Sequence, residues 1–279
     1  MKLISHRYGK ARVRVLKVFR DGARHDIREV EVSVMLEGNF DPAYLHGDNS
    51  LVVATDTMKN TVHALAKEKL QQQIEDFGLA LGGHFLERYP QVSRAIIRLV
   101  EQPWARMSID GQPHPHGFTA GGPARPFAEV SCARDGATSV ESGVEDLCIL
   151  KTAGSGFAGY VKNEYTTLAE TKDRILATNM EASWHFAGTP RSYSESNGRS
   201  LDAMLRAFAT QHSPSVQASL YLMASAALEV VPEIDQVRVC MPNKHCLLVN
   251  LAPFDLENGN EIFVPTDEPH GEIEAIVTR

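Results

Sequence analysis

The pattern of apolar residues predicts an α+β protein made of antiparallel sheets. Apolar residues alternate in paired segments, as they do in strands with one buried face, and longer segments with helical periodicity separate those pairs. The order strand, strand, helix, strand, strand occurs twice, once in each half of the 279 residues. This order implies helices segregated to one face of an antiparallel sheet in each half.

The first half begins with two strands joined by a turn. Val30, Val32 and Val34 alternate to one face of the second strand, and the turn contains Asp21-Gly22, which is typical of a hairpin. Pro90 ends the helical part that follows. The expected elements are strands at 11–19 and 27–36, helices at 58–69 and 71–89, and strands at 92–100 and 127–133.

The second half repeats the order of elements without an obvious repeat of the residues themselves. We therefore expect two domains, residues 1–136 and 137–279, with a boundary near Ala137. The expected elements of the second domain are strands at 144–151 and 157–165, a mostly helical stretch at 201–228, and strands at 236–240 and 246–250.

Composition excludes several classes of protein. Hydrophobic residues make up 43% of the chain, enough for a substantial core, but no uncharged apolar window reaches the roughly 18 residues that a membrane helix needs. The net charge of −7 argues against a nucleic-acid-binding surface. The four cysteines form no C-x-x-C pair, and the N-terminal residues lack the apolar stretch expected of a signal peptide. We expect a cytoplasmic protein with reduced cysteines.

The segment Ser50 to Val62 raises a question about its polar residues. The apolar residues 51–54 read as a buried strand, or as the last extended residues before a helix, and Thr55, Asp56 and Thr57 follow at once. Thr and Asp are good helix N-caps. Because only one side chain can be the cap, at least one of the three is free to face something else.

Further polar clusters stand where other expected elements end. Taken alone, each residue has an ordinary explanation: Lys10 as a solvated lysine, Gln217 as a surface amide, His245 as a hydrogen-bonded structural histidine. The candidates in these clusters are Lys10, Thr55, Asp56, Phe157, Arg174, Val216, Gln217, Asn243 and His245.

One of these segments, LKTAGSGFAGYVKNEYTTLAETKDR, closely resembles the sequence pattern of urate oxidase, or uricase. The fragments YGK, VVATDTMKNT, DGQPHPHGF, SVQAS and PNKH also occur in the order of that family, so the resemblance covers nearly the whole chain. Ala153 replaces a commoner hydroxyl residue, Ala158 replaces a frequent tryptophan, and there is no C-terminal peroxisomal tripeptide. These departures leave the matched site residues in place and fit a bacterial-type enzyme.

The resemblance implies a fold and an assembly. The fold would be two tandem tunnelling-fold (T-fold) domains, whose antiparallel sheets close into a barrel on oligomerisation. The assembly would be a homotetramer with its sites at the dimer interface. In each site, Lys10, Thr55 and Asp56 of one subunit would face Phe157, Arg174 and the other candidates of its neighbour.

The resemblance also implies a reaction, the oxidation of urate by dioxygen to 5-hydroxyisourate and hydrogen peroxide with neither metal nor organic cofactor. Urate is a flat anion, so its site needs an aromatic ring that stacks on it and side chains that form hydrogen bonds with its edges. Phe157 would supply an aromatic face, Arg174 a bidentate guanidinium and Gln217 an amide for the other edge. Backbone groups of Val216, Gln217, Thr55 and Asp56 would complete the recognition of its edges.

Proton transfer is the remaining task that the resemblance assigns to the protein. Lys10, Thr55 and His245 would form a relay that removes protons from urate and so raises its electron density. Asn243 would sit over the ring plane, where its amide can hold dioxygen or the attacking water.

Two other interpretations stay open. His114 and His116 are two residues apart and could be half of a metal site in a cyclohydrolase-like enzyme acting on a purine or pterin, although no third ligand is evident from the sequence. A duplicated binding domain without activity is the second alternative, and it would require the loss of Lys10 or Thr55. Both are present.

Overall fold

A computed structural model describes all 279 residues and divides them into two compact units. Unit 1 comprises Met1–Val144 and His185–Ser194, and unit 2 comprises Glu145–Trp184 and Glu195–Arg279. The structure confirms the α+β class with antiparallel sheets. The expected boundary at 136 and 137 lies in the turn before β7 (Thr138–Lys151), whereas the compact units divide inside β7. The two divisions differ because β7 is one continuous strand that contributes to both units.

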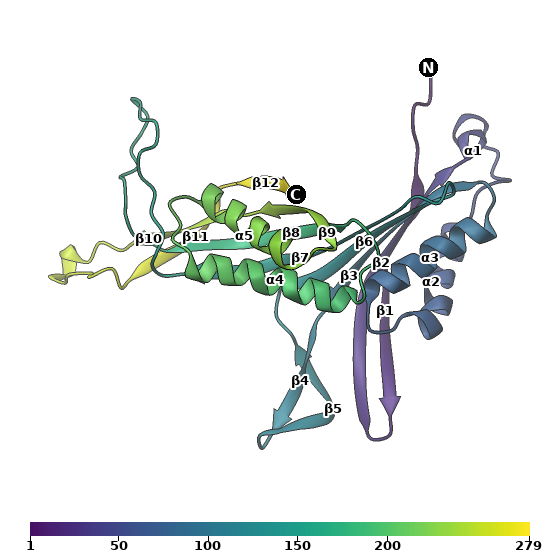
Figure 1. Cartoon of the computed structure of the whole chain (residues 1–279), viewed down its shortest axis with the longest axis horizontal. Helices are drawn as coiled ribbons and strands as arrows, with labels where there is room; N and C mark the ends of the chain where they lie inside the picture. The colour runs from purple at the N-terminus through teal and green to yellow at the C-terminus, as the bar shows by residue number, and fades with distance from the viewer. The chain divides into compact units, whose positions relative to one another are not determined.

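The sheet of unit 1 has the order β1-β2-β3-β6, followed by β7. Its first four strands are β1 (Tyr8–Asp21), β2 (Arg24–Gly38), β3 (Val92–Gln102) and β6 (Arg125–Ala133), each antiparallel to the next. Helix α3 (Ile74–Arg88) packs on β3 and β6, and α2 (Thr55–Lys69) packs on β1 (Figure 1). A short helix, α1 (Asp41–His46), follows β2.

The core of unit 1 lies between this sheet and its two long helices. Val30, Val32 and Val34 are fully buried on the helix side of β2, as their alternation predicts. The helices contribute Met58, Val62, Phe77, Leu81 and Phe85 to the same core. On the other side of the sheet, charged residues pair across strands, as Arg12 does with Glu31 at 3.1 Å. This sheet therefore has one apolar and one ionic face.

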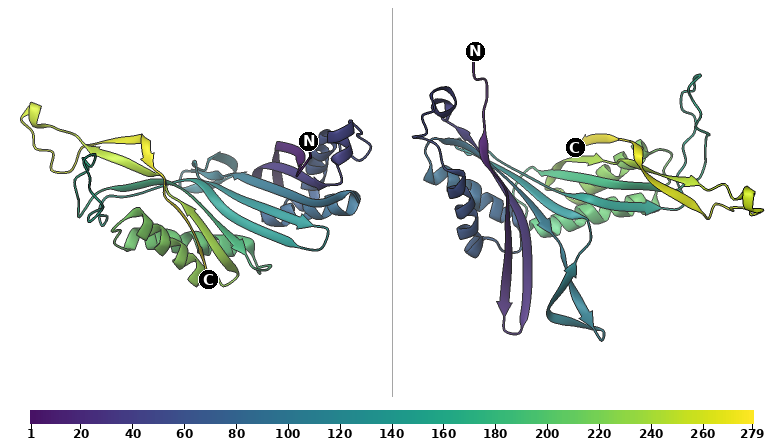
Figure 2. Two further views of the ribbon diagram at one scale, coloured as in Figure 1. Left: turned by 90° about the horizontal axis from the view of Figure 1, so that it is seen from above. Right: turned by 180° about the vertical axis from the view of Figure 1, so that it is seen from behind.

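A two-stranded arm that the sequence did not predict contains the QPHPHGF fragment. Its strands are β4 (Trp104–Ile109) and β5 (Gln112–Ala120), and Figure 2 shows them apart from the main sheet. Arg106 fixes the arm, since its guanidinium donates to the carbonyl oxygens of His114 at 2.7 Å and of His25 in β2 at 2.6 Å.

Unit 2 contains the second half of β7 and, apart from residues 185–194, the elements that follow it. These are β8 (Leu176–Phe186), α4 (Tyr193–Thr210), α5 (Val216–Val230), β9 (Ile234–Cys240), β10 (Asn243–Leu248), the 3-10 turn η1 (Ala252–Phe254), β11 (Phe263–Gly271) and β12 (Glu274–Thr278). The strand order is β7-β8-β10-β11, with β9 pairing β8 and β12. Helix α5 packs on β9 and β12. No helix in the chain is both long enough and apolar enough to cross a membrane.

The expectations for the second half were wrong or incomplete at several points, and the last two strands, β11 and β12, were not expected at all. Residues 157–165 form a loop and no strand, because glycine interrupts the apolar pattern there. Strand β8 was missed, since it is buried on nearly every residue and shows no alternation. The helical stretch is two helices, separated by a segment that contains Pro214.

Candidate active site

Four of the residues singled out in the sequence line one pocket of unit 2. Phe157, Arg174, Asn243 and His245 line a cavity of about 540 Å³. Phe157 and Arg174 come from the loop between β7 and β8, and the other two come from the start of β10. The pocket therefore brings together an aromatic ring, a guanidinium, an amide and an imidazole.

Arg174 and Phe157 form the best-defined pair in this pocket. The guanidinium carbon lies 5.3 Å from the centroid of the Phe157 ring, and that ring stacks on Tyr160 at 4.8 Å. Burial lowers the pKa of Arg174 from its ordinary value, although the group stays cationic at neutral pH. Its Nε is buried and has no hydrogen-bond partner in the chain.

Main-chain hydrogen bonds fix the loop that carries this pair. The amide of Phe157 donates to the carbonyl of Thr171 at 2.8 Å, and the amide of Thr171 donates back at 3.0 Å. The Asp173 carboxylate accepts from the amide of Gly154 at 2.8 Å. The two ends of the loop are thus held together although its middle is exposed, with Tyr165 83% accessible.

Val216 and Gln217 do not line this pocket. They begin α5, whose N-cap Ser215 accepts from the amide of Ala218 at 3.2 Å, and Val216 is buried while Gln217 is exposed. The preceding Ser213 bonds to the Phe157 loop through its amide and its carbonyl. The structure therefore ties Val216 and Gln217 to the pocket through the main chain.

Asn243 and His245 are positioned by β10. Asn243 pairs with Thr178 of β8, and His245 pairs with Thr266 of β11. Between them, Lys244 forms an ion pair with Asp267 at 2.8 Å, and this hydrogen bond raises the pKa of Lys244. Because Lys244 is held as a cation by the Asp267 carboxylate, it is not available as a base in the pocket.

Lys10, Thr55 and Asp56 lie in unit 1, where the YGK fragment has a clear structural role. The Tyr8 hydroxyl accepts from the amide of Val53 at 2.8 Å, which holds the chain just before Thr55. Gly9 is required because a Cβ there would lie 1.8 Å from the carbonyl oxygen of Val34. A register shift after Lys10 then interrupts the β1–β2 pairing.

The structure shows whether Thr55, Asp56 or Thr57 caps α2. The side-chain cap that the sequence offered as the ordinary explanation does not form: the N-cap is Ala54, no side chain caps the helix, and residues 51–54 form no strand. Thr55 and Asp56 stand in the first turn, so their amides have no acceptor within the helix. The helix therefore presents free N–H groups, at the end where the helix dipole favours an anion.

The Asp56 carboxylate itself is engaged along the helix. It accepts from Lys59 at 2.5 Å and from the side-chain amide of Asn60 at 3.0 Å. The pKa of Asp56 is lowered mainly by the Lys59 hydrogen bond and to a smaller extent by the charge of Lys10. Lys10 and the first turn of α2 therefore interact electrostatically within unit 1.

His114 and His116 have no metal-ligand set around them. Both lie on β5, with ring centroids 4.6 Å apart. No group of three or more His, Cys, Asp or Glu side chains in the chain is arranged to hold a metal ion. The third ligand that the cyclohydrolase-like alternative needs is therefore not supplied by neighbouring residues.

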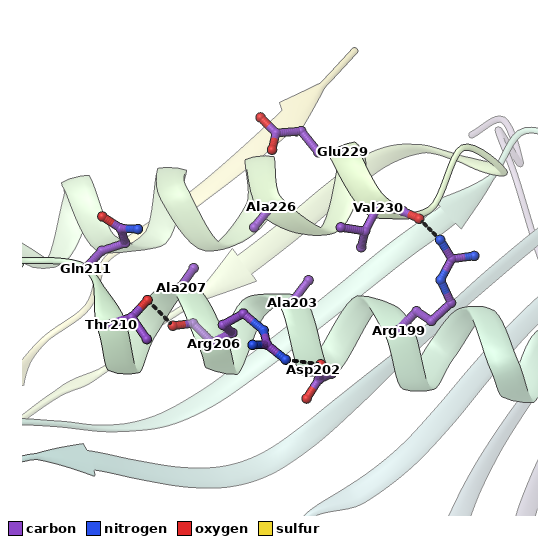
Figure 3. A pocket seen from close by; sticks show the side chains of 10 residues that line it. All are labelled: Arg199, Asp202, Ala203, Arg206, Ala207, Thr210, Gln211, Ala226, Glu229 and Val230. Carbon is purple, nitrogen blue, oxygen red and sulfur yellow. Dashed lines mark hydrogen bonds and ion pairs between the residues drawn. The ribbon is translucent and has the colours of Figure 1, made fainter.

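A second concavity, between α4 and α5, lacks the chemistry of the first. Figure 3 shows alanines and charged side chains around it, and all of the charged side chains except Glu229 are joined by dashed lines to other lining residues. Arg206 pairs with Asp202 at 3.3 Å, and Arg199 donates to the carbonyl of Val230. We assign it no role in the site.

Other residues of the first pocket were not singled out in the sequence. Leu168, Asn260 and Phe263 contribute to its wall. Leu168 belongs to the motif that carries the resemblance, so the sequence contained a signal for it. Asn260 comes from the β10–β11 connection and Phe263 is the first residue of β11, and neither belongs to a motif that the sequence singled out.

The fold and this pocket define an α+β protein suited to binding a flat, polar molecule. The family model described as Uricase matches residues 6–131 and 140–274. Uricase of Arabidopsis thaliana is 40% identical over 99% of this chain and 96% of its own length, and Uricase-2 of Phaseolus vulgaris is 40% identical over 98% and 94%. The crystal structure of uricase from Arthrobacter globiformis matches with a TM-score of 0.95 and 39% identity, covering 100% of this chain and 95% of that one. The chain belongs to the uricase family.

Proposed function

We propose that this protein oxidises urate with dioxygen and water to 5-hydroxyisourate and hydrogen peroxide, without a metal or an organic cofactor. The observation that carries the proposal is the Arg174 guanidinium beside the Phe157 ring in the pocket of unit 2. Relatives named uricase, about 40% identical over nearly the whole chain, support the choice of urate as substrate.

Substrate binding follows from the charge and shape of urate. Its anionic bicycle stacks on Phe157, and the Arg174 guanidinium donates two parallel hydrogen bonds to one edge. The Gln217 side chain and the Val216 backbone recognise the opposite edge. The free amides of Thr55 and Asp56, at the positive end of the α2 dipole, complete the site.

Proton transfer follows from the remaining candidates. Lys10, Thr55 and His245 form the relay that takes protons from bound urate, which raises the electron density that dioxygen then removes. Two electrons pass from urate to dioxygen, which leaves as hydrogen peroxide, and water adds to the oxidised ring. Asn243 holds dioxygen or water above the ring plane.

The assembly we propose is a homotetramer in which two chains share each site. Lys10, Thr55 and Asp56 of one chain meet the pocket of its neighbour, as the T-fold sheets of two chains close into a barrel. Ion pairs on the uncovered face of the unit 1 sheet suit the wet interior of such a barrel. Exposed apolar residues on the β10–β11 connection, including Phe254 and Leu256, suit contact with another chain.

The decisive experiment follows the ultraviolet absorbance of urate mixed with the purified protein in air. The proposal expects loss of urate together with hydrogen peroxide, no loss without dioxygen, and full activity after dialysis against a chelator. Activity that disappears on dialysis and returns only with added metal would support the cyclohydrolase-like alternative. Intact urate in air would refute the proposal.

A further inference from the structure

Ser155 lies where three segments meet, and these segments carry Phe157, Arg174 and Gln217, the side chains proposed to bind urate. Its carbonyl oxygen accepts from the amide of Arg174 at 2.7 Å. On its other side it bridges Ser213, which precedes α5: the amide of Gly156 donates to Ser213 at 2.8 Å, and the amide of Ser213 donates to Gly154 at 2.9 Å. Ser155 therefore joins the loop of Phe157, the main chain of Arg174 and the segment that leads to Gln217.

The hydroxyl of Ser155 has no role in this main-chain network. The residue is fully buried, with 0% of its surface accessible, and its Oγ has no hydrogen-bond partner in the chain. A buried hydroxyl without a partner costs free energy, and alanine would fill nearly the same space without that cost. Packing alone therefore does not explain a serine at this position.

Arg174, the residue bonded to Ser155 through the main chain, also has an unpartnered buried atom. Its Nε has no acceptor, although a guanidinium that lies in a binding pocket needs a fixed orientation to present its terminal nitrogens. A serine hydroxyl rotates freely and can accept from an N–H donor. The two unsatisfied groups are thus complementary and belong to adjacent residues in the fold.

We propose that Ser155 is a positioning residue for Arg174. In the urate-bound state its hydroxyl accepts a hydrogen bond from Arg174 Nε, directly or through one water molecule, and both terminal nitrogens are left for the edge of urate. This inference rests on the proposed function. It assigns Ser155 to binding geometry and gives it no part in proton transfer or in the reaction with dioxygen.

The test compares Ser155→Ala with Ser200→Ala. Ser200, on α4, is a matched control because it is also 0% accessible and also carries an unpartnered hydroxyl. Urate binding is measured by titration without dioxygen, and turnover is measured in air. Ser155→Ala should weaken binding roughly tenfold, keep kcat within about twofold and leave the melting temperature at or above that of the parent. Ser200→Ala should change neither constant.

Two further variants separate positioning from a general effect on the fold. Ser155→Cys keeps the volume but accepts hydrogen bonds poorly, so it should weaken binding as the alanine does. In an Arg174→Ala background, Ser155→Ala should add no further loss, because its effect acts through the guanidinium.

The outcomes distinguish this inference from the function on which it rests. Parent-like urate binding by Ser155→Ala, or an equal loss in the presence and absence of Arg174, would overturn the inference and leave the proposed function standing. A loss of melting temperature without a change in binding would also overturn it, by making the hydroxyl structural. A parent protein that binds no urate would overturn both.

Discussion

The guanidinium carbon of Arg174 lies 5.3 Å from the centroid of the Phe157 ring, in a loop whose ends are held by hydrogen bonds between Phe157 and Thr171. The two groups proposed to hold urate are therefore in contact before a ligand arrives. Such preorganisation reduces the entropy that binding must overcome. Mutations can therefore test the geometry of the pair separately from its charge.

Arg174→Lys should weaken urate binding markedly although it keeps the positive charge. An ammonium is a point charge that cannot make the two parallel hydrogen bonds of a guanidinium, so we expect a loss on the order of tenfold or more. Titration with urate in the absence of dioxygen measures this loss. Binding equal to that of the parent would mean that charge attraction is sufficient.

Lys10→Met should reduce kcat more than it affects binding. Removal of a positioned base costs on the order of 100-fold to 10,000-fold in rate. Lys67→Met is the control, because Lys67 is an exposed lysine at the other end of α2 from Thr55. Turnover in air and binding without dioxygen are measured for both variants. Near-normal turnover by Lys10→Met would remove Lys10 from the relay.

Gly9→Ala should destabilise the protein, because the new Cβ would lie 1.8 Å from the carbonyl oxygen of Val34. We expect a cost of about 2 kcal/mol or more, since main chain must move. Gly83→Ala is the matched control: it lies in α3, has nothing within 4 Å of its Cβ position, and should gain up to about 1 kcal/mol. Melting curves of the two variants should therefore shift in opposite directions.

The partly buried carboxyl of Glu101 should make the stability of the folded protein depend on pH. Burial raises the pKa of this carboxyl above its ordinary 4.5, and the Arg28 side chain at 3.6 Å opposes that effect only in part. Because the folded protein takes up the proton at higher pH than the unfolded chain, the parent gains stability as pH falls through the raised pKa toward 4.5. Glu101→Gln cannot gain in this way. Its melting temperature relative to the parent should therefore be highest near neutral pH and should decline on acidification, whereas a constant difference would contradict this account.

The sequence predicted elements well where the side-chain pattern has a clear period. Alternating valines marked β2, and helical spacing marked α2 and α3, because one face of each packs on a core. Strand β8 was not predictable in this way because both of its faces are buried. The β4–β5 arm was missed because the proline and histidine residues of β5 give no apolar alternation.

The candidate site was predicted by the family resemblance more than by local pattern. Spacing alone could not bring Phe157 and Arg174 to the same pocket as Asn243 and His245, because loop closure and strand pairing set those contacts. Capping rules favoured a side-chain cap before α2, but the chain places Ala54 there and leaves the amides free. A local rule was broken at the position where the proposed function uses free amides to bind urate.

The proposed sharing of each site between two chains can be tested with mixed tetramers. Thr55→Ala and Arg174→Ala each damage a different half of the proposed site, so either variant alone should be nearly inactive. In a twofold dimer of one chain of each kind, one site carries both substitutions and the other carries neither. Co-expression with two different tags, followed by tandem purification, should therefore recover urate oxidation, up to roughly a quarter of the parental activity if chains mix at random. If purified mixed assemblies are as inactive as either variant alone, one chain supplies all of the residues of each site, and the shared site is contradicted.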